Sequence, residues 1–142
     1  MKVVYLFILV AMSNWVQADY NPDDDRFGKQ LKNAIEMIEV SNYEKAIQIL
    51  NDLVNLQSED ADVWNLLGYS NRKLGNLEDA GHSYRQALLY NPEHKGALEY
   101  QGELFLQLND LSSAKKNLQK LREICPQGCE ELTDLEQALA SH

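Results

Sequence analysis

Apolar, small and polar positions repeat every 34 residues between Phe27 and Gly128, and within each period the apolar positions recur at helical spacing. Two columns of this alignment hold only small residues: Ala34, Gly68 and Gly102 in the first half of the period, and Ala46, Ala80 and Ala114 in the second. Small side chains at fixed points let two helices approach closely. Each of the segments 27–60, 61–94 and 95–128 is therefore predicted to be a helical hairpin.

A turn is predicted near the middle of each segment. Its first column holds residues that tolerate turn geometry: Ser41, Gly75 and Asn109. The next column holds residues whose side chains can cap a following helix: Asn42, Asn76 and Asp110. Pro92 and Pro126 end the second helices of the last two segments.

One more amphipathic helix is expected after the third segment, from about Cys129 to Leu139. Its apolar stripe consists of Leu132, Leu135 and Leu139. The pattern therefore predicts an all-α chain of three hairpins, with a capping helix and tail in residues 129–142.

The second segment resembles the tetratricopeptide repeat in both residue types and spacing. The matching residues are Trp64, Leu67, Gly68, Ala80, Tyr84, Ala87 and Pro92. The third segment keeps Leu98, Gly102, Ala114 and Pro126, whereas the first has Gln30 and Asn33 where the second has Trp64 and Leu67. The resemblance implies a right-handed superhelical stack of three repeats, of which the first is divergent.

The N-terminal 26 residues lie outside the repeats. Lys2 is followed by an apolar run at 3–12 and by small residues at Val16 and Ala18. This is typical of a secretory signal peptide cut after Ala18, since a membrane anchor requires about 20 apolar residues. We therefore expect a signal peptide at 1–18, a solvated acidic linker at 19–26, and a mature protein in the periplasm or outside the cell.

Charge and composition exclude several classes of function. Acids outnumber bases 22 to 13, and loss of Lys2 with the leader moves the formal charge from −9 to −10, which argues against binding to nucleic acid or anionic lipid. His82, His94 and His142 show neither triad-like nor metal-ligand spacing, and His94 is expected at the surface. No enzymatic activity, cofactor or metal is expected.

Two cysteines, Cys125 and Cys129, flank the turn before the last helix in the sequence Cys-Pro-Gln-Gly-Cys. In an exported protein this spacing favours a disulfide that ties the capping helix to the third repeat. Two alternatives stay open, a redox-active pair at a helix N-terminus and a copper site, although the thioredoxin-like context of such motifs is missing.

The family resemblance implies a function, because tetratricopeptide stacks hold a partner's peptide in a concave groove lined by their first helices. The residues carried over to that groove are Leu31, Ile35, Ile38, Asn65, Tyr69, Arg72, Lys73, Glu99, Glu103, Leu106 and Gln107. The family's clamp for a C-terminal carboxylate is not matched; its places hold Leu31, Ile35, Leu66, Gly96 and Tyr100. The expected function is an adaptor for a protein or peptide partner, with Tyr69 and Arg72 as anchors.

The first segment is ambiguous because its groove positions are apolar. Either its first helix is rotated by about one residue, which makes Leu31, Ile35 and Ile38 core and is the favoured interpretation, or these residues form an exposed patch. Two alternative functions also remain, thiol redox or copper handling by the two cysteines, and weak homodimer formation through the terminal repeats.

Overall fold

The structure, a computed structural model, describes residues 25–142, and this part of the chain contains seven helices and no strand. The helices are α1 (Arg26–Glu39), α2 (Tyr43–Leu56), α3 (Ala61–Lys73), α4 (Leu77–Tyr90), α5 (Lys95–Gln107), α6 (Leu111–Ile124) and α7 (Glu130–Ala140). The predicted all-α class is confirmed. The predicted signal peptide and nearly all of the acidic linker lie outside the described residues, so both stay predictions. None of the described helices is long and apolar enough to cross a membrane.

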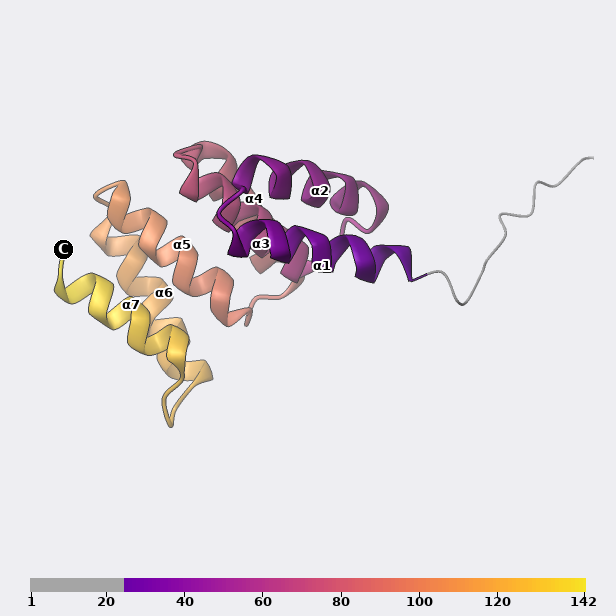
Figure 1. The fold of residues 1–142 in the computed structure, drawn as a ribbon. Helices are drawn as coiled ribbons and strands as arrows, with labels where there is room; N and C mark the ends of the chain where they lie inside the picture. The colour runs from indigo at the N-terminus through magenta and orange to yellow at the C-terminus, as the bar shows by residue number, and fades with distance from the viewer. Residues whose placement is uncertain (1–24) are drawn as a thin grey trace, which may run out of the picture.

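Helices pair in chain order and the pairs stack on one another (Figure 1). α1 packs against α2, α3 against α4 and α5 against α6, and each pair also contacts the next. α7 packs more extensively against α5 than against α6. The first helix of the third pair is therefore covered on a face that a partner was expected to occupy.

The three predicted turns adopt the left-handed backbone conformation that their residue types tolerate. Ser41 has φ 59°, Gly75 has φ 82° and Asn109 has φ 57°. The following column caps the second helices at two of its three positions: Asn42 and Asp110 accept hydrogen bonds from backbone N–H groups three residues on, at 3.2 and 3.0 Å. The capping pattern that the sequence predicts is thus largely reproduced.

Asn76 and His94 differ from expectation. The side chain of Asn76 does not cap α4; its Nδ2 donates to Oδ1 of Asn71 at 3.3 Å. His94 is not a free surface residue, because its Nδ1 accepts from the N–H of Ala97 at 3.0 Å and caps α5, while Nε2 lies 2.8 Å from Oδ1 of Asp62. His94 therefore links the second and third repeats.

The columns of small residues do bring helices into close contact. Gly68 of α3 lies against the fully buried ring of Tyr84 in α4, so closely that a Cβ at this position would be 2.6 Å from two ring carbons. At Gly102 of α5 a Cβ would be 2.7 Å from the side chain of Leu135 in α7. The same column thus serves a hairpin contact in one repeat and the docking of α7 in the next.

The first repeat combines the two alternatives that its sequence left open. Leu31 and Ile38 pack, with Phe27 and Met37, against a buried core that includes Ala34. Ile35 is 38% exposed and takes no part in that core. The helix therefore packs two of the three apolar groove positions, both half-buried, against the core and presents the third to solvent.

The Gly68 contact yields a prediction about stability. Gly68→Ala should lower the free energy of unfolding by about 1–3 kcal/mol, because overpacking against the immobile Tyr84 ring outweighs the better helix propensity of alanine. Gly81→Ala is the matched control: its Cβ would meet only side-chain atoms of Arg85 and Leu104, at 3.4 and 3.5 Å. Urea unfolding of both variants checks this, and equal stabilities would contradict it.

Candidate binding groove

The predicted groove residues divide by exposure when they are placed on α1, α3 and α5. Four are largely buried: Asn65, Arg72, Glu99 and Leu106. Four are half-buried: Leu31, Ile38, Tyr69 and Glu103. Three are exposed: Ile35, Lys73 and Gln107. The accessible part of the predicted groove is therefore concentrated on α1 and α3 and at the C-terminal end of α5.

Three half-buried tyrosines from the three successive repeats form a continuous row. Tyr43 of α2 lies 6.3 Å from Tyr69 of α3, and Tyr69 lies 5.0 Å from Tyr100 of α5, measured between ring centroids. The edge-on and tilted geometries are those that aromatic pairs favour. Only Tyr69 was predicted as a groove residue, because the other two stand in different columns of the repeat alignment. We call these three residues the tyrosine row.

Arg72 connects α3 to α5 beneath the tyrosine row. Its guanidinium lies 5.9 and 5.8 Å from the ring centroids of Tyr69 and Tyr100, and its Nη2 is 2.5 Å from Oε2 of Glu103. Both ring distances are within the range of cation–π attraction. Only 9% of the Arg72 side chain is exposed, and Nε has no hydrogen-bond partner among the described residues.

The charge of Arg72 is maintained in spite of its burial. Desolvation alone would lower its pKa, but the neighbouring Tyr84 and Glu103 raise it above the usual value. Burial also raises the pKa of Tyr84, so this phenol stays neutral. Arg72 therefore acts as a charged bridge between repeats, and the anchoring role that the sequence suggested for it stays a prediction.

Lys73 is the cation on α3 that solvent and a partner can reach. Its side chain is exposed, and Nζ lies 5.6 Å from the centroid of the Tyr69 ring. Tyr69 is thus flanked by one buried and one accessible cation, both from its own helix. An accessible aromatic ring beside an accessible ammonium can contact an apolar group and a carboxylate at the same time.

Glu99 of α5, in contrast to the exposed Lys73, is buried. It is 6% exposed, and burial raises its pKa to about 8, an effect reinforced by the carboxylates of Glu103, Asp134 and Glu131 and opposed by Arg72. Asp134 and Glu131 belong to α7. Glu99 therefore lies within electrostatic range of two carboxylates of the capping helix, and its burial removes it from the accessible part of the groove.

The two cysteines lie where the sequence predicted a tether. Cys125 and Cys129 are at disulfide distance, with a Cα–Cα separation of 5.9 Å, and they terminate α6 and precede α7. Among residues 25–142, no group of three or more His, Cys, Asp and Glu side chains is placed to hold a metal ion.

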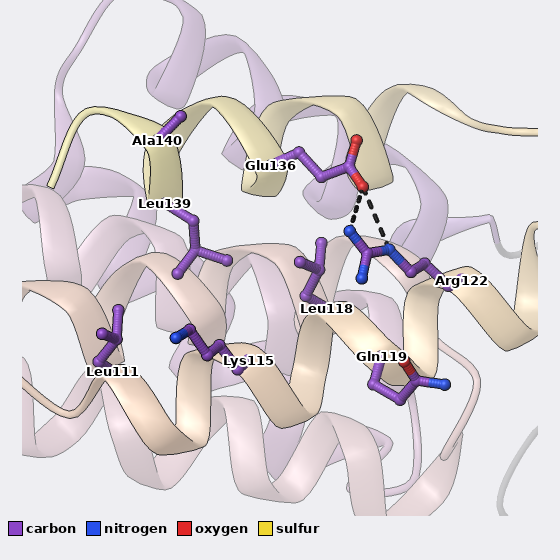
Figure 2. Close-up of a pocket in the computed structure, with 8 residues that line it drawn as sticks. All are labelled: Leu111, Lys115, Leu118, Gln119, Arg122, Glu136, Leu139 and Ala140. Atoms are coloured by element: carbon purple, nitrogen blue, oxygen red, sulfur yellow. Dashed lines mark hydrogen bonds and ion pairs between the residues drawn. The ribbon is translucent and has the colours of Figure 1, made fainter.

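A pocket that the sequence did not indicate lies between α6 and α7, with a volume of about 650 Å³. Figure 2 shows Leu139 pointing from α7 toward α6 and Leu118 pointing from α6 toward α7. An ion pair between Arg122 and Glu136, with Nη2 2.7 Å from Oε1, bridges the two helices in the same view. The lining of the pocket combines leucine side chains with the charged groups of Lys115, Arg122 and Glu136.

Comparison with known proteins assigns the repeats. Residues 61–94 and 97–128 each match a family model described as tetratricopeptide repeat. The chain is a tetratricopeptide-repeat protein. No curated protein sequence matches it.

Solved tetratricopeptide structures share the fold of this tetratricopeptide-repeat protein. The translocator chaperone SycD of Yersinia enterocolitica superposes with a TM-score of 0.74 at 21% identity, covering 85% of this chain and 91% of SycD. PcrH bound to the chaperone-binding region of PopB gives 0.73 at 22% identity, covering 84% and 96%. The first such domain of Spaghetti (RPAP3) with an HSP90 peptide gives 0.71 at 19%, covering 83% and 96%. At these identities the likeness shows the fold alone.

The cysteine pair generates a prediction about this tetratricopeptide-repeat protein. Reduction should lower the free energy of unfolding by about 2 kcal/mol, because a short loop is no longer closed in the unfolded chain. The Cys125→Ser/Cys129→Ser double variant should show the same loss and no further response to reductant. Thermal melts with and without reductant test this, and an unchanged melting temperature in the native chain would show that the pair is not a structural tether.

Arg72 and Lys73 should differ in their effect on stability. Arg72→Met should cost about 1–3 kcal/mol, a range kept modest because 28% of the Glu103 side chain is exposed. Lys73→Met, at the exposed neighbouring position, should change stability by less than about 0.5 kcal/mol. Chemical denaturation of the pair checks this; an equally stable Arg72→Met variant would mean that the bridge contributes nothing.

Proposed function

We propose that this protein is a non-enzymatic interaction module that binds a segment of a partner protein across the first helices of its first two repeats. One observation carries the proposal: an exposed Ile35, a half-buried Tyr69 and an exposed Lys73 occupy the groove positions of α1 and α3. The 34-residue offset puts Ile35 and Tyr69 at the same position of successive first helices. Successive first helices thus present an apolar group on α1 and, on α3, an aromatic ring with a cation 5.6 Å from its centroid.

The chemistry of these residues indicates the kind of segment that would bind. Ile35 and Tyr69 offer apolar contact area, and aromatic residues are enriched among interface hot spots. Lys73 offers an ammonium to a carboxylate, although an exposed pair of this kind contributes more to specificity than to affinity. The best-fitting partner segment therefore presents apolar side chains toward α1 and an acidic side chain near the C-terminal end of α3.

The comparisons support a binding role of this type. SycD has been solved with a peptide of the translocator YopD, PcrH with binding regions of PopB and PopD, and the Spaghetti domain with the HSP90 peptide SRMEEVD. In each case a protein of this fold holds a short segment of another protein. The carboxylate clamp is unmatched in this chain, so an internal segment is proposed as the ligand instead of a C-terminal tail.

Histidine placement also favours binding over catalysis. His94 is occupied by its hydrogen bonds to Ala97 and Asp62. His82 lies edge-on to Trp64 with the ring centroids 5.7 Å apart. Both imidazoles are therefore engaged in contacts that position helices, whereas the third, His142, lines the small pocket that also includes Glu103 and Gln107.

Two groove variants and one control test the proposal. Partners are captured with the full chain from the exported fraction of its source, and the bound segment is then titrated as a synthetic peptide by calorimetry. Tyr69→Ala and Lys73→Glu should each lower the affinity for that peptide by about tenfold or more, which corresponds to about 1.4 kcal/mol of binding free energy. Lys116→Glu makes the same charge change at an exposed site on α6 and should leave the affinity unchanged. Equal affinities for all three variants would place the binding site elsewhere.

A further inference from the structure

α7 packs on α5 of the third repeat, where it covers Gly102 of the small-residue column and the groove position Leu106. The side chain of Leu135 is fully buried, and it lies in the space that a Cβ at Gly102 would fill. Ala138 of α7 and Leu106 of α5 belong to the same apolar cluster and line the same small pocket beside Glu103. An amphipathic helix of this chain therefore already occupies part of the surface that the first helix of the third repeat would offer to a partner.

The apolar contacts of α7 are favourable, but its charges are not. The helix carries four acids, namely Glu130, Glu131, Asp134 and Glu136, and no base. Two of them, Glu131 and Asp134, act on the buried Glu99 of α5, where Glu103 adds a further negative charge. Only Glu136 has a cationic partner, Arg122 of α6.

Other elements do little to relieve this repulsion. Arg72 of α3 is the one cation among the leading influences on Glu99, and it is already paired with Glu103. Tyr100 of α5 is neutral, because burial first and then Glu99 raise its pKa to about 12. None of the leading influences comes from α4 or α6, although both pack against α5. The neutral acid is therefore the favoured form of Glu99 at this interface below about pH 8.

We propose that α7 is a pH-gated lid on the concave face of the third repeat, docked while Glu99 is protonated and loosened when Glu99 ionises against Glu131 and Asp134. The Cys125–Cys129 pair and Gly128, which has φ 93°, form the hinge that keeps an opened lid close to its seat. Opening would extend the binding groove of the first two repeats onto α5. In this respect the lid rests on the proposed function, but the motion of α7 is measurable without any partner.

The direction of the pH effect follows from the two states of Glu99. The usual pKa of Glu99 is 4.5. In the docked state burial raises this pKa to about 8, reinforced first by Glu103 of α5 and then by Asp134 and Glu131 of α7. Opening of α7 would remove its two carboxylates and expose Glu99 to water, so the open state has the lower pKa and releases the proton that the docked state holds. Docking is therefore strongest at low pH, weakens as pH rises toward 8 and levels off above it. For one proton, the opening constant rises by up to about tenfold per pH unit within this window.

Hydrogen exchange on the full chain with its disulfide intact tests the lid. Protection factors, corrected for the intrinsic pH dependence of exchange, are measured for α7, α5 and α1 at pH 6, 7, 8 and 9. Protection of α7 should fall by about tenfold or more from pH 6 to pH 8 and then level off, while amides of α1 stay unchanged. An α7 whose protection is constant over this range overturns the proposal.

Variants distinguish the ionisation of Glu99 from a general effect of pH on α7. Glu99→Gln, which is neutral and similar in shape, should flatten the α7 profile, whereas Glu123→Gln, an exposed carboxyl of α6, should keep the native profile. Asp134→Asn should shift the levelling-off to lower pH by removing one repelling carboxylate. If the protection of α7 fell between pH 6 and pH 8 in Glu99→Gln as it does in the native chain, the role of Glu99 would be refuted. A lid that opens as described while Tyr69 and Lys73 variants bind normally would reject the proposed function alone.

Discussion

The close contact between Gly68 and Tyr84 sets the distance between the two helices of the second repeat. Because a Cβ at Gly68 would come within 2.6 Å of the ring, the tyrosine can lie against the backbone of α3 only when this residue is glycine. The buried Tyr84 ring also packs against Tyr100 of the next repeat, with the ring centroids 6.5 Å apart. Tyr84 is, in addition, among the groups that raise the pKa of Arg72. The position of the groove floor thus depends on one missing methyl group.

The close contact between Gly68 and Tyr84 also leads to an apolar core that is shared between repeats. Ala80 and Tyr84 of α4 form one buried cluster with Leu104 of α5, so this core belongs to neither repeat alone. A hairpin of two amphipathic helices cannot bury its apolar face without a neighbour. The ion pair between Arg72 and Glu103 spans the same junction, and its orientation is fixed by the packing around it. Stability and groove shape therefore arise from the same contacts.

The sequence could predict most of what depends on one column of the repeat. The turns at Ser41, Gly75 and Asn109, the helix pairs and the small-residue contacts are local, and the periodicity records each of them more than once. Contacts between columns could not be predicted in this way. Tyr69 meets Tyr43 and Tyr100, and Arg72 meets Glu103, at separations other than 34 residues, because these pairs depend on how far one repeat is rotated against the next. The predicted groove list therefore contained Arg72 and Glu99 as surface residues, although packing buries both.

The placement of α7 shows why an apolar stripe alone does not determine where a helix docks. Leu132, Leu135 and Leu139 were expected to cap the stack, and they do pack on the third repeat. The seat for Leu135, however, is supplied by Gly102, whose counterpart Gly68 receives a side chain from its own hairpin. Because Gly102 has no Cβ, α7 can pack closely on α5. This packing also brings Asp134 and Glu131 of α7 within electrostatic range of Glu99. An uncompensated buried carboxyl at a helix–helix contact reduces the stability of that contact wherever it ionises. The third repeat therefore presents a partly covered surface held by an imperfect interface, and the first two repeats present an open one.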